Sequence, residues 1–212
     1  MEFLKQAANI FLHLDVHLNE VIQAYGTLTY AILFLIIFCE TGLIITPFLP
    51  GDSLLFTSGS LAALGSLSYP AVFFWLCLAA ILGDSSNYWI GHHVGARGFK
   101  KNTRFLKQSY LDRTQAFYEQ HGAKTVLLAR FLPILRTFAP FVAGMGKMPY
   151  SRFVFFSVTG TLLWVGLCSL AGYAFGNIPV IKANFSLVVL GIIGVSLLPA
   201  IYGALKARKN PA

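Results

Sequence analysis

Charged residues are scarce in this chain: they make up 11% of its 212 residues, whereas a soluble globular domain has about 25%. Hydrophobic residues account for 56% of the sequence, and the mean hydropathy is +0.67. This composition excludes an ordinary soluble protein, and we predict an integral membrane protein instead. The length fits a single domain of a few membrane spans over residues 1–212.

Acidic residues are half as frequent as basic ones, with eight Asp and Glu against sixteen Lys and Arg, so the net charge is +8. A basic excess of this kind can indicate a nucleic-acid partner, but no RNA- or DNA-binding motif accompanies it. The basic residues instead gather at segment ends and in residues 97–124, as they do in cytoplasmic loops of membrane proteins. We predict a cytoplasmic loop there and no nucleic-acid partner.

Cysteine is also rare, and Cys39, Cys77 and Cys168 lie in apolar runs without the spacing of a metal site. His13 and His17 are four residues apart, but no third ligand is in view. The sequence lacks a Gly-x-Ser-x-Gly elbow, a His-Glu-x-x-His zinc helix and a phosphate loop ending in Lys-Ser/Thr. We predict no metal, no cofactor and no enzymatic activity; a membrane hydrolase is the enzymatic alternative.

One apolar stretch, residues 38–52, holds two carboxylates and several helix-breaking residues. A helix in lipid keeps its backbone groups paired internally, so a break survives there only inside protein or beside a water-filled cavity. Ionisable groups at membrane depth are costly and mark functional sites. The segment after the break is too short to cross the bilayer, which predicts a re-entrant hairpin over about 29–67. The carboxylates are Glu40 and Asp52, and the predicted breaks are Pro47, Pro50 and Gly51.

A second stretch, residues 125–146, repeats the tripeptide Phe-Leu-Pro but carries Arg130 and Arg136 in place of acids. Basic residues flank it on both sides, so it is expected to enter and leave the membrane from the cytoplasm. This predicts a second re-entrant hairpin with breaks at Pro133 and Pro140. Guanidinium groups offer fixed planar donors that suit phosphate or carboxylate.

The rest of the chain predicts an amphipathic interfacial helix over 3–24, a short surface helix over 110–121, and spans over 71–91, 153–175 and 185–205. In the first span, Asp84 and Asn87 are three residues apart on one helix face. They either line a polar cavity or cap neighbouring backbone near the water boundary. Two spans end in Tyr-x-x-Gly, which indicates an inverted repeat. The predicted fold class is therefore an all-α polytopic membrane protein with two opposed hairpins.

Taken together, these motifs resemble the DedA family of bacterial inner-membrane proteins, which is related to the eukaryotic VTT-domain lipid scramblases. The matching segments are Phe38-Cys-Glu-Thr-Gly42, Pro47-Phe-Leu-Pro-Gly-Asp-Ser53, Gly83-Asp84, Asn87-Tyr88-x-x-Gly91, Arg130-Phe-x-Pro-x-x-Arg136, Ala139-Pro-Phe-Val-Ala-Gly144 and Gly172-Tyr173. The resemblance implies two opposed re-entrant hairpins in the inner membrane and the movement of lipid phosphates between leaflets. It also implies dependence on the proton motive force, with undecaprenyl phosphate or phosphatidylethanolamine as the lipid.

The functional hypothesis is a flippase for an anionic lipid phosphate, either undecaprenyl phosphate or a phospholipid, coupled to protons. The predicted phosphate-binding residues are Arg130, Arg136, Ser53 and Thr137; the proton-coupling residues are Glu40 and Asp52; the secondary candidates are Asp84, Asn87 and Tyr88. The alternatives are an uncoupled scramblase and a membrane homeostasis or assembly factor without transport activity. The lipid, the direction of transport, the side of the N-terminal helix and homo-oligomerisation stay open.

Overall fold

The computed structural model describes residues 14–43, 51–98 and 124–176, with separate parts of 178–194. These residues form helices and connecting turns, and no strand occurs among them, so the all-α prediction is confirmed for the described chain. The predicted surface helix over 110–121 lies outside the described residues. So do the breaks at Pro47 and Pro50, the start of the N-terminal helix and most of the last predicted span.

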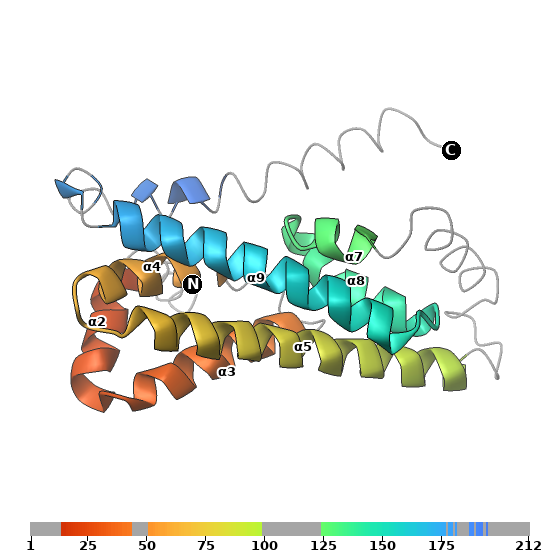
Figure 1. The fold of residues 1–212 in the computed structure, drawn as a ribbon. Helices are drawn as coiled ribbons and strands as arrows, with labels where there is room; N and C mark the ends of the chain where they lie inside the picture. Colours follow the sequence, from red (N-terminus) through yellow and green to blue (C-terminus); the bar gives the residue numbers. More distant parts are fainter. Residues whose placement is uncertain are drawn as a thin grey trace, which may run out of the picture. The chain divides into compact units, whose positions relative to one another are not determined.

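Figure 1 shows the helices along the chain. They are α2 (Leu14–Tyr25), α3 (Leu28–Gly42), α4 (Gly51–Ala63), α5 (Tyr69–Gly98), α7 (Lys124–Ala129), α8 (Pro133–Met145) and α9 (Tyr150–Phe175). Within the described chain, Tyr69–Val94 of α5 and the whole of α9 are long and apolar enough to cross a membrane. Each has 26 residues, or roughly 39 Å of helix against a hydrocarbon core of about 30 Å. α3 is a shorter apolar helix of 15 residues.

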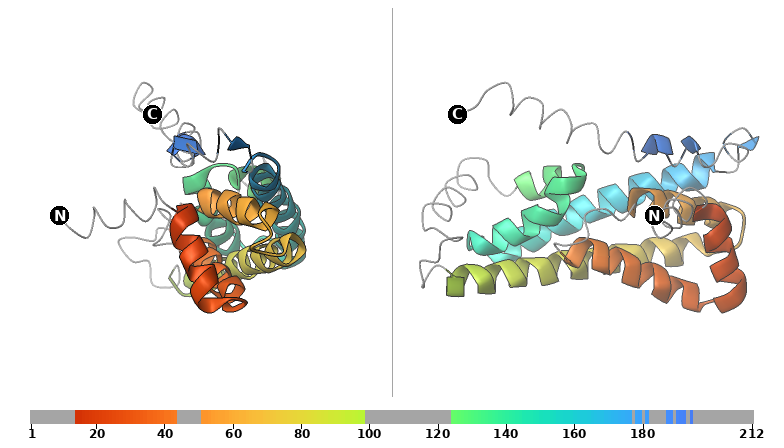
Figure 2. Two further views of the ribbon diagram at one scale, coloured as in Figure 1. Left: turned by 90° about the vertical axis from the view of Figure 1, so that its left-hand side faces the viewer. Right: turned by 180° about the vertical axis from the view of Figure 1, so that it is seen from behind.

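The chain divides into two compact units. Unit 1 comprises residues 1–36, 49–78 and 165–212. In it, α4 lies beside the C-terminal part of α9 (Figure 2). The two backbones approach so closely that a Cβ on Gly59 would collide with the carbonyl oxygen of Ser169, and one on Gly172 with that of Phe56. Small residues permit this close packing between membrane helices.

Unit 2 comprises residues 37–48 and 79–164. In it, α7 packs against α8, and both lie beside the N-terminal part of α9 (Figure 1). α8 also meets α5 at backbone distance, because a Cβ on Gly91 would strike the carbonyl of Phe141 and one on Gly144 that of Tyr88. A core cluster supports this packing and consists of Tyr88, Val126, Ala143, Met148 and Phe153.

Three of the predicted helix-breaking residues, Gly51, Pro133 and Pro140, lie in the described chain, and all three belong to helices. α4 begins at Gly51, so Asp52 lies in its first helical turn, where an acidic side chain interacts favourably with the helix dipole. Pro133 is the first residue of α8, a position at which proline needs no N–H partner. The sequence also predicts a break at Pro140, whereas α8 continues through it to Met145. The proline removes one hydrogen bond and crowds the carbonyl of Arg136, and the packing of α8 against α5 and α7 offsets that cost.

Candidate functional site

Four charged side chains are buried among the described residues, and all four belong to unit 2: Glu40, Asp84, Arg130 and Arg136. Each is at most 5% exposed. Glu40 comes from α3, Asp84 from α5, Arg130 from the turn after α7, and Arg136 from α8. We call these four residues the charged cluster. The sequence-predicted pair of arginines is thus brought together with one predicted acid and one secondary candidate.

Two ion pairs join the members of the charged cluster. Arg136 donates a hydrogen bond of 2.6 Å from Nη2 to Oε1 of Glu40. Arg130 donates from Nη1 to Oδ2 of Asp84. Burying four charges is tolerated only because each has an opposite partner, and removing one partner of a buried pair costs about 3–5 kcal/mol.

Arg130 keeps part of its hydrogen-bonding capacity unused. Among the described residues, its Nε and Nη2 are buried without a hydrogen-bond partner. These two atoms lie on the same edge of the planar guanidinium, and this edge can grip two oxygens of one anion at once. The Asp84 carboxylate therefore occupies one end of Arg130 and leaves the two-pronged edge open.

Ser157 on α9 fixes the Asp84 side chain. Its hydroxyl donates a hydrogen bond of 2.5 Å to Oδ2, the same oxygen that accepts from Arg130. The other oxygen, Oδ1, is buried and has no hydrogen-bond partner in the described part of the chain. Asp84 can therefore lose Arg130 to a ligand and still be held in place by the hydroxyl.

The sequence left open whether Asn87 lines a polar cavity or caps neighbouring backbone. In the structure Asn87 is fully buried near the charged cluster, and its side chain caps backbone carbonyls. Its Nδ2 donates to the carbonyl of Thr41 at 3.3 Å and to that of Thr137 at 2.6 Å. These carbonyls follow Glu40 and Arg136 in the chain, so Asn87 ties α5 to both elements that carry the second ion pair. Tyr88 donates its hydroxyl to the carbonyl of Met148 and is part of the core.

Sequence reasoning missed Trp164, which both arginines contact. The Cζ atoms of Arg130 and Arg136 lie over its ring, at 5.4 Å and 4.5 Å from the centroid. Trp164 is 3% exposed and comes from α9. It shares one face of α9 with Ser157 at a spacing of seven residues, but a serine and a tryptophan in an apolar span give the sequence no signal of a site.

The remaining predicted site residues are Asp52, Ser53 and Thr137. Asp52 and Ser53 belong to unit 1, where Ser53 is buried and its hydroxyl has no hydrogen-bond partner among the described residues. Thr137 is buried next to Arg136, and its backbone carbonyl is what accepts from Asn87. The substrate and proton roles of these residues stay predictions.

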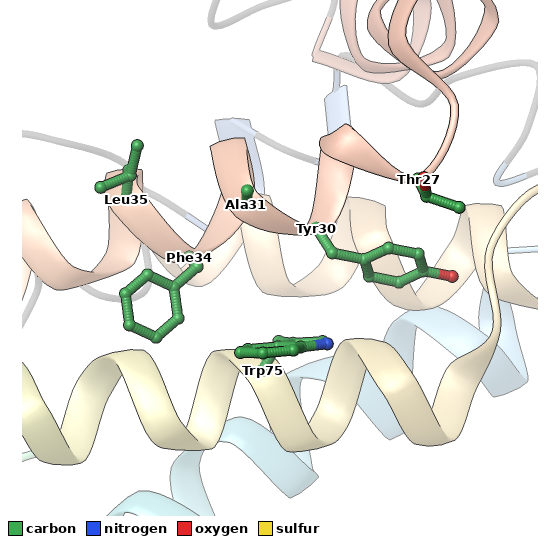
Figure 3. Close-up of a pocket in the computed structure, with 6 residues that line it drawn as sticks. All are labelled: Thr27, Tyr30, Ala31, Phe34, Leu35 and Trp75. Atoms are coloured by element: carbon green, nitrogen blue, oxygen red, sulfur yellow. The ribbon is translucent and has the colours of Figure 1, made fainter.

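Unit 1 contains an apolar pocket of about 490 Å³ (Figure 3). Its lining residues are Thr27, Tyr30, Ala31, Phe34, Leu35 and Trp75. The rings of Phe34 and Trp75 meet edge to face, with centroids 6.1 Å apart. The described lining is apolar apart from the Thr27 and Tyr30 hydroxyls and contains no charged side chain. In the described chain, no group of three or more His, Cys, Asp or Glu could hold a metal ion.

Comparison of the sequence with known proteins identifies its family. The VTT domain matches residues 49–174, which include Asp84 and both arginines of the charged cluster. Protein DedA of Escherichia coli K12 is 50% identical over 215 residues, covering 100% of this chain and 98% of that protein. The chain belongs to the DedA family.

Other DedA-family relatives are more distant. An uncharacterised membrane protein of Mycobacterium leprae is 46% identical over 80% of this chain and 76% of its own length. The inner membrane protein YqjA of Escherichia coli K12 is 38% identical over 71% of this chain and 69% of its own length. No solved structure matches the chain. The family and the long apolar helices identify a multi-pass protein of the bacterial inner membrane.

Proposed function

We propose that this DedA-family protein moves an anionic lipid phosphate, undecaprenyl phosphate or a phospholipid, across the inner membrane. The proposal rests on one observation: two buried arginines meet in a membrane protein, and each is held by a carboxylate. A guanidinium cannot lose its charge, so at membrane depth it requires an anion at all times. A lipid phosphate can replace the carboxylates as that anion.

Arg130 is the residue at which the head group would first bind. Its Nε–Nη2 edge has no hydrogen-bond partner in the described chain, so a phosphate can bind there before Asp84 is displaced. Arg136 would follow by exchanging Glu40 for a second phosphate oxygen. The lipid chain stays in the hydrocarbon region throughout. Ser53 and Thr137 are retained as further head-group residues on the sequence argument.

Charge balance links this binding to protons. The two arginines and two carboxylates of the charged cluster sum to zero, so a bound phosphate adds net negative charge. A proton taken up by Glu40 offsets that charge, and its release on the other side of the membrane lets the arginine pair again. Asp84 is a second carboxylate able to do this. The structure adds Asp84 as a partner of Arg130, whereas proton coupling by Asp52 rests on the family resemblance.

We further propose that α3–α4 and α7–α8 are the two re-entrant hairpins of an inverted repeat. α7 and α8 pack together across a break at 130–132, as a hairpin requires. The contacts of the two units also correspond: Phe56 meets Gly172 in unit 1, and Phe141 meets Gly91 in unit 2. Each contact joins the second limb of one proposed hairpin to the span that follows the other.

The test is lipid translocation by the full-length protein in proteoliposomes, with and without a pH gradient. Arg136→Ala is expected to abolish head-group binding and translocation, because the second oxygen contact is lost. Glu40→Gln keeps a hydrogen-bonding partner for Arg136 and is expected to bind lipid but to lose the dependence on the gradient. An exposed matched substitution, Glu20→Gln on α2, serves as the control.

The same assay separates the alternatives. Gradient dependence that persists in Glu40→Gln would reject the coupling role of that residue. Movement in both directions without any gradient in the wild type would identify an uncoupled scramblase. No movement at all would favour an assembly factor, and release of inorganic phosphate from the lipid would identify a hydrolase.

A further inference from the structure

We propose that Trp164 is a positioning residue that holds both arginines in an anion-binding arrangement. This inference rests on the proposed function, because it explains how that site is kept ready for a phosphate. Two guanidinium carbons lie over one buried indole, at 5.4 Å and 4.5 Å from its centroid. They are therefore within about 10 Å of each other.

Two cations at this separation repel each other, and the repulsion is strong in a poorly solvated interior. The face of an indole carries negative quadrupolar charge and attracts a cation within about 6 Å of the ring centroid. Trp164 therefore offsets part of the repulsion between Arg130 and Arg136 without adding a formal charge.

The contact with Trp164 also leaves the N–H donors of the two arginines available. A guanidinium that lies over a ring uses its face, while its N–H groups point outward in its own plane. Each arginine can therefore keep its contact with Trp164 while its edge binds a carboxylate or a phosphate. The Nε–Nη2 edge of Arg130 has no hydrogen-bond partner among the described residues, so no other acceptor competes for it while Cζ contacts the ring.

The same face of α9 makes room for the arginine stem. A Cβ added to Gly160 would lie 3.3 Å from Cδ of Arg130 and 3.5 Å from Cα of Leu127. Gly160 is one helical turn before Trp164, and Ser157 is a further turn back. α9 therefore presents a hydroxyl that fixes Asp84, a glycine that admits Arg130 and an indole that aligns both guanidinium groups.

Substitution of Trp164 tests the positioning role through head-group affinity. The probes are dodecyl phosphate and inorganic phosphate, titrated into the full-length protein in detergent by calorimetry. Trp164→Leu is expected to lower the affinity roughly ten- to a hundredfold, since both ring contacts are lost. Trp164→Phe keeps a smaller aromatic face and is expected to recover part of that loss. Trp75→Phe, a change at an exposed tryptophan of unit 1, is the matched control.

Fluorescence gives a second readout that a purely structural tryptophan would not move. In a Trp75→Phe/Trp89→Phe background, Trp164 is the remaining tryptophan of the chain. Its emission is expected to change along the dodecyl phosphate binding curve, because the guanidinium groups shift over the ring as they exchange partners. Arg136→Ala should abolish that change.

The outcomes are distinct. Wild-type affinity in Trp164→Leu, or constant Trp164 emission while the probe saturates the site, would overturn the positioning role. If the wild type binds neither probe, the proposed function itself fails. An emission change with dodecyl phosphate alone supports a lipid head-group site. An equal change with inorganic phosphate supports the positioning role but assigns it to a free phosphate.

Discussion

Two helix contacts in this protein have the same packing and different chemistry. In unit 1, α4 meets α9 through Gly59 and Gly172; in unit 2, α8 meets α5 through Gly144 and Gly91. A separation of 85 residues relates Gly59 to Gly144 and Tyr88 to Tyr173. Gly172 is related in this way to Asn87, one helical turn before Gly91, so the two contacts correspond after a shift of one turn along the span. The same separation relates the charged Asp84 of unit 2 to Ser169 of unit 1.

The interiors of the two contacts differ in how their polar groups are satisfied. In unit 1 the hydroxyls of Thr57, Ser58 and Ser169 donate to carbonyls four residues earlier in their own helices, at 2.6–2.8 Å. In unit 2 the polar groups reach other elements, as Ser157 does to Asp84 and Asn87 to Thr41 and Thr137. Glycine and hydroxyl packing is therefore the shared framework, and the four buried charged side chains of the described chain all belong to unit 2.

The largest difference is expected at the related pair Asp84 and Ser169. Asp84→Ala leaves Arg130 buried without its carboxylate and should lower the free energy of unfolding by about 3–5 kcal/mol. Ser169→Ala removes a hydroxyl that donates within its own helix and lies 3.1 Å from the hydroxyl of Tyr69, so it breaks only bonds between neutral groups, and a loss of about 1 kcal/mol is expected. Thermal and denaturant unfolding in detergent measures both. Equal losses of unfolding free energy would show that the Arg130–Asp84 pair contributes no more to stability than the neutral hydrogen bonds of Ser169.

A smaller difference is expected at the glycines. Gly144→Ala and Gly172→Ala each force two helix backbones apart and should both cost about 1–3 kcal/mol of unfolding free energy. Only Gly144→Ala is expected also to weaken dodecyl phosphate binding, since α8 carries Arg136. Gly191→Ala, at a site with open space around it, is the control for each. An equal loss of binding in Gly172→Ala would contradict the assignment of the site to unit 2.

The smallest effect is expected at the tyrosines. Tyr88→Phe removes the hydroxyl that donates to the carbonyl of Met148 and should cost about 1 kcal/mol of unfolding free energy. Tyr173 is 44% exposed, and its hydroxyl makes no hydrogen bond to the described residues, so Tyr173→Phe should change stability by less than that. Denaturant unfolding of the two variants in detergent measures the difference in unfolding free energy. A larger loss in Tyr173→Phe would reverse the comparison.

Much of the helical architecture could be predicted from the sequence, because it follows from hydrophobic length and from proline. The long apolar segments became α5 and α9, and Pro133 marks the start of α8. Pro140 shows the limit of this reasoning, since a proline inside a packed helix need not end it. Of the break predicted over 47–52, Pro47 and Pro50 lie outside the described residues, and Gly51 and Asp52 belong to the first turn of α4.

The candidate site could be predicted only in part. Charge at membrane depth singled out Glu40, Arg130 and Arg136, which the structure buries and pairs. The partner of Arg130 could not be chosen, because pairing depends on which helices meet rather than on spacing within one helix. Trp164 and Ser157 carry no unusual signal within an apolar span, and their importance follows from the face that α9 turns toward the charged cluster.

Pro140 has a mechanical consequence for the residue one turn before it. Proline has no N–H to give, so the rung that would join it to the carbonyl of Arg136 is missing from α8. A helix flexes most readily where a rung is absent. A small bend there would move the side chain of Arg136, while Gly144 remains packed against α5. The hydrogen bond missing at Pro140 is thus the one that Arg136 would accept, and a change in the curvature of α8 would change the direction of the side chain that we propose binds phosphate.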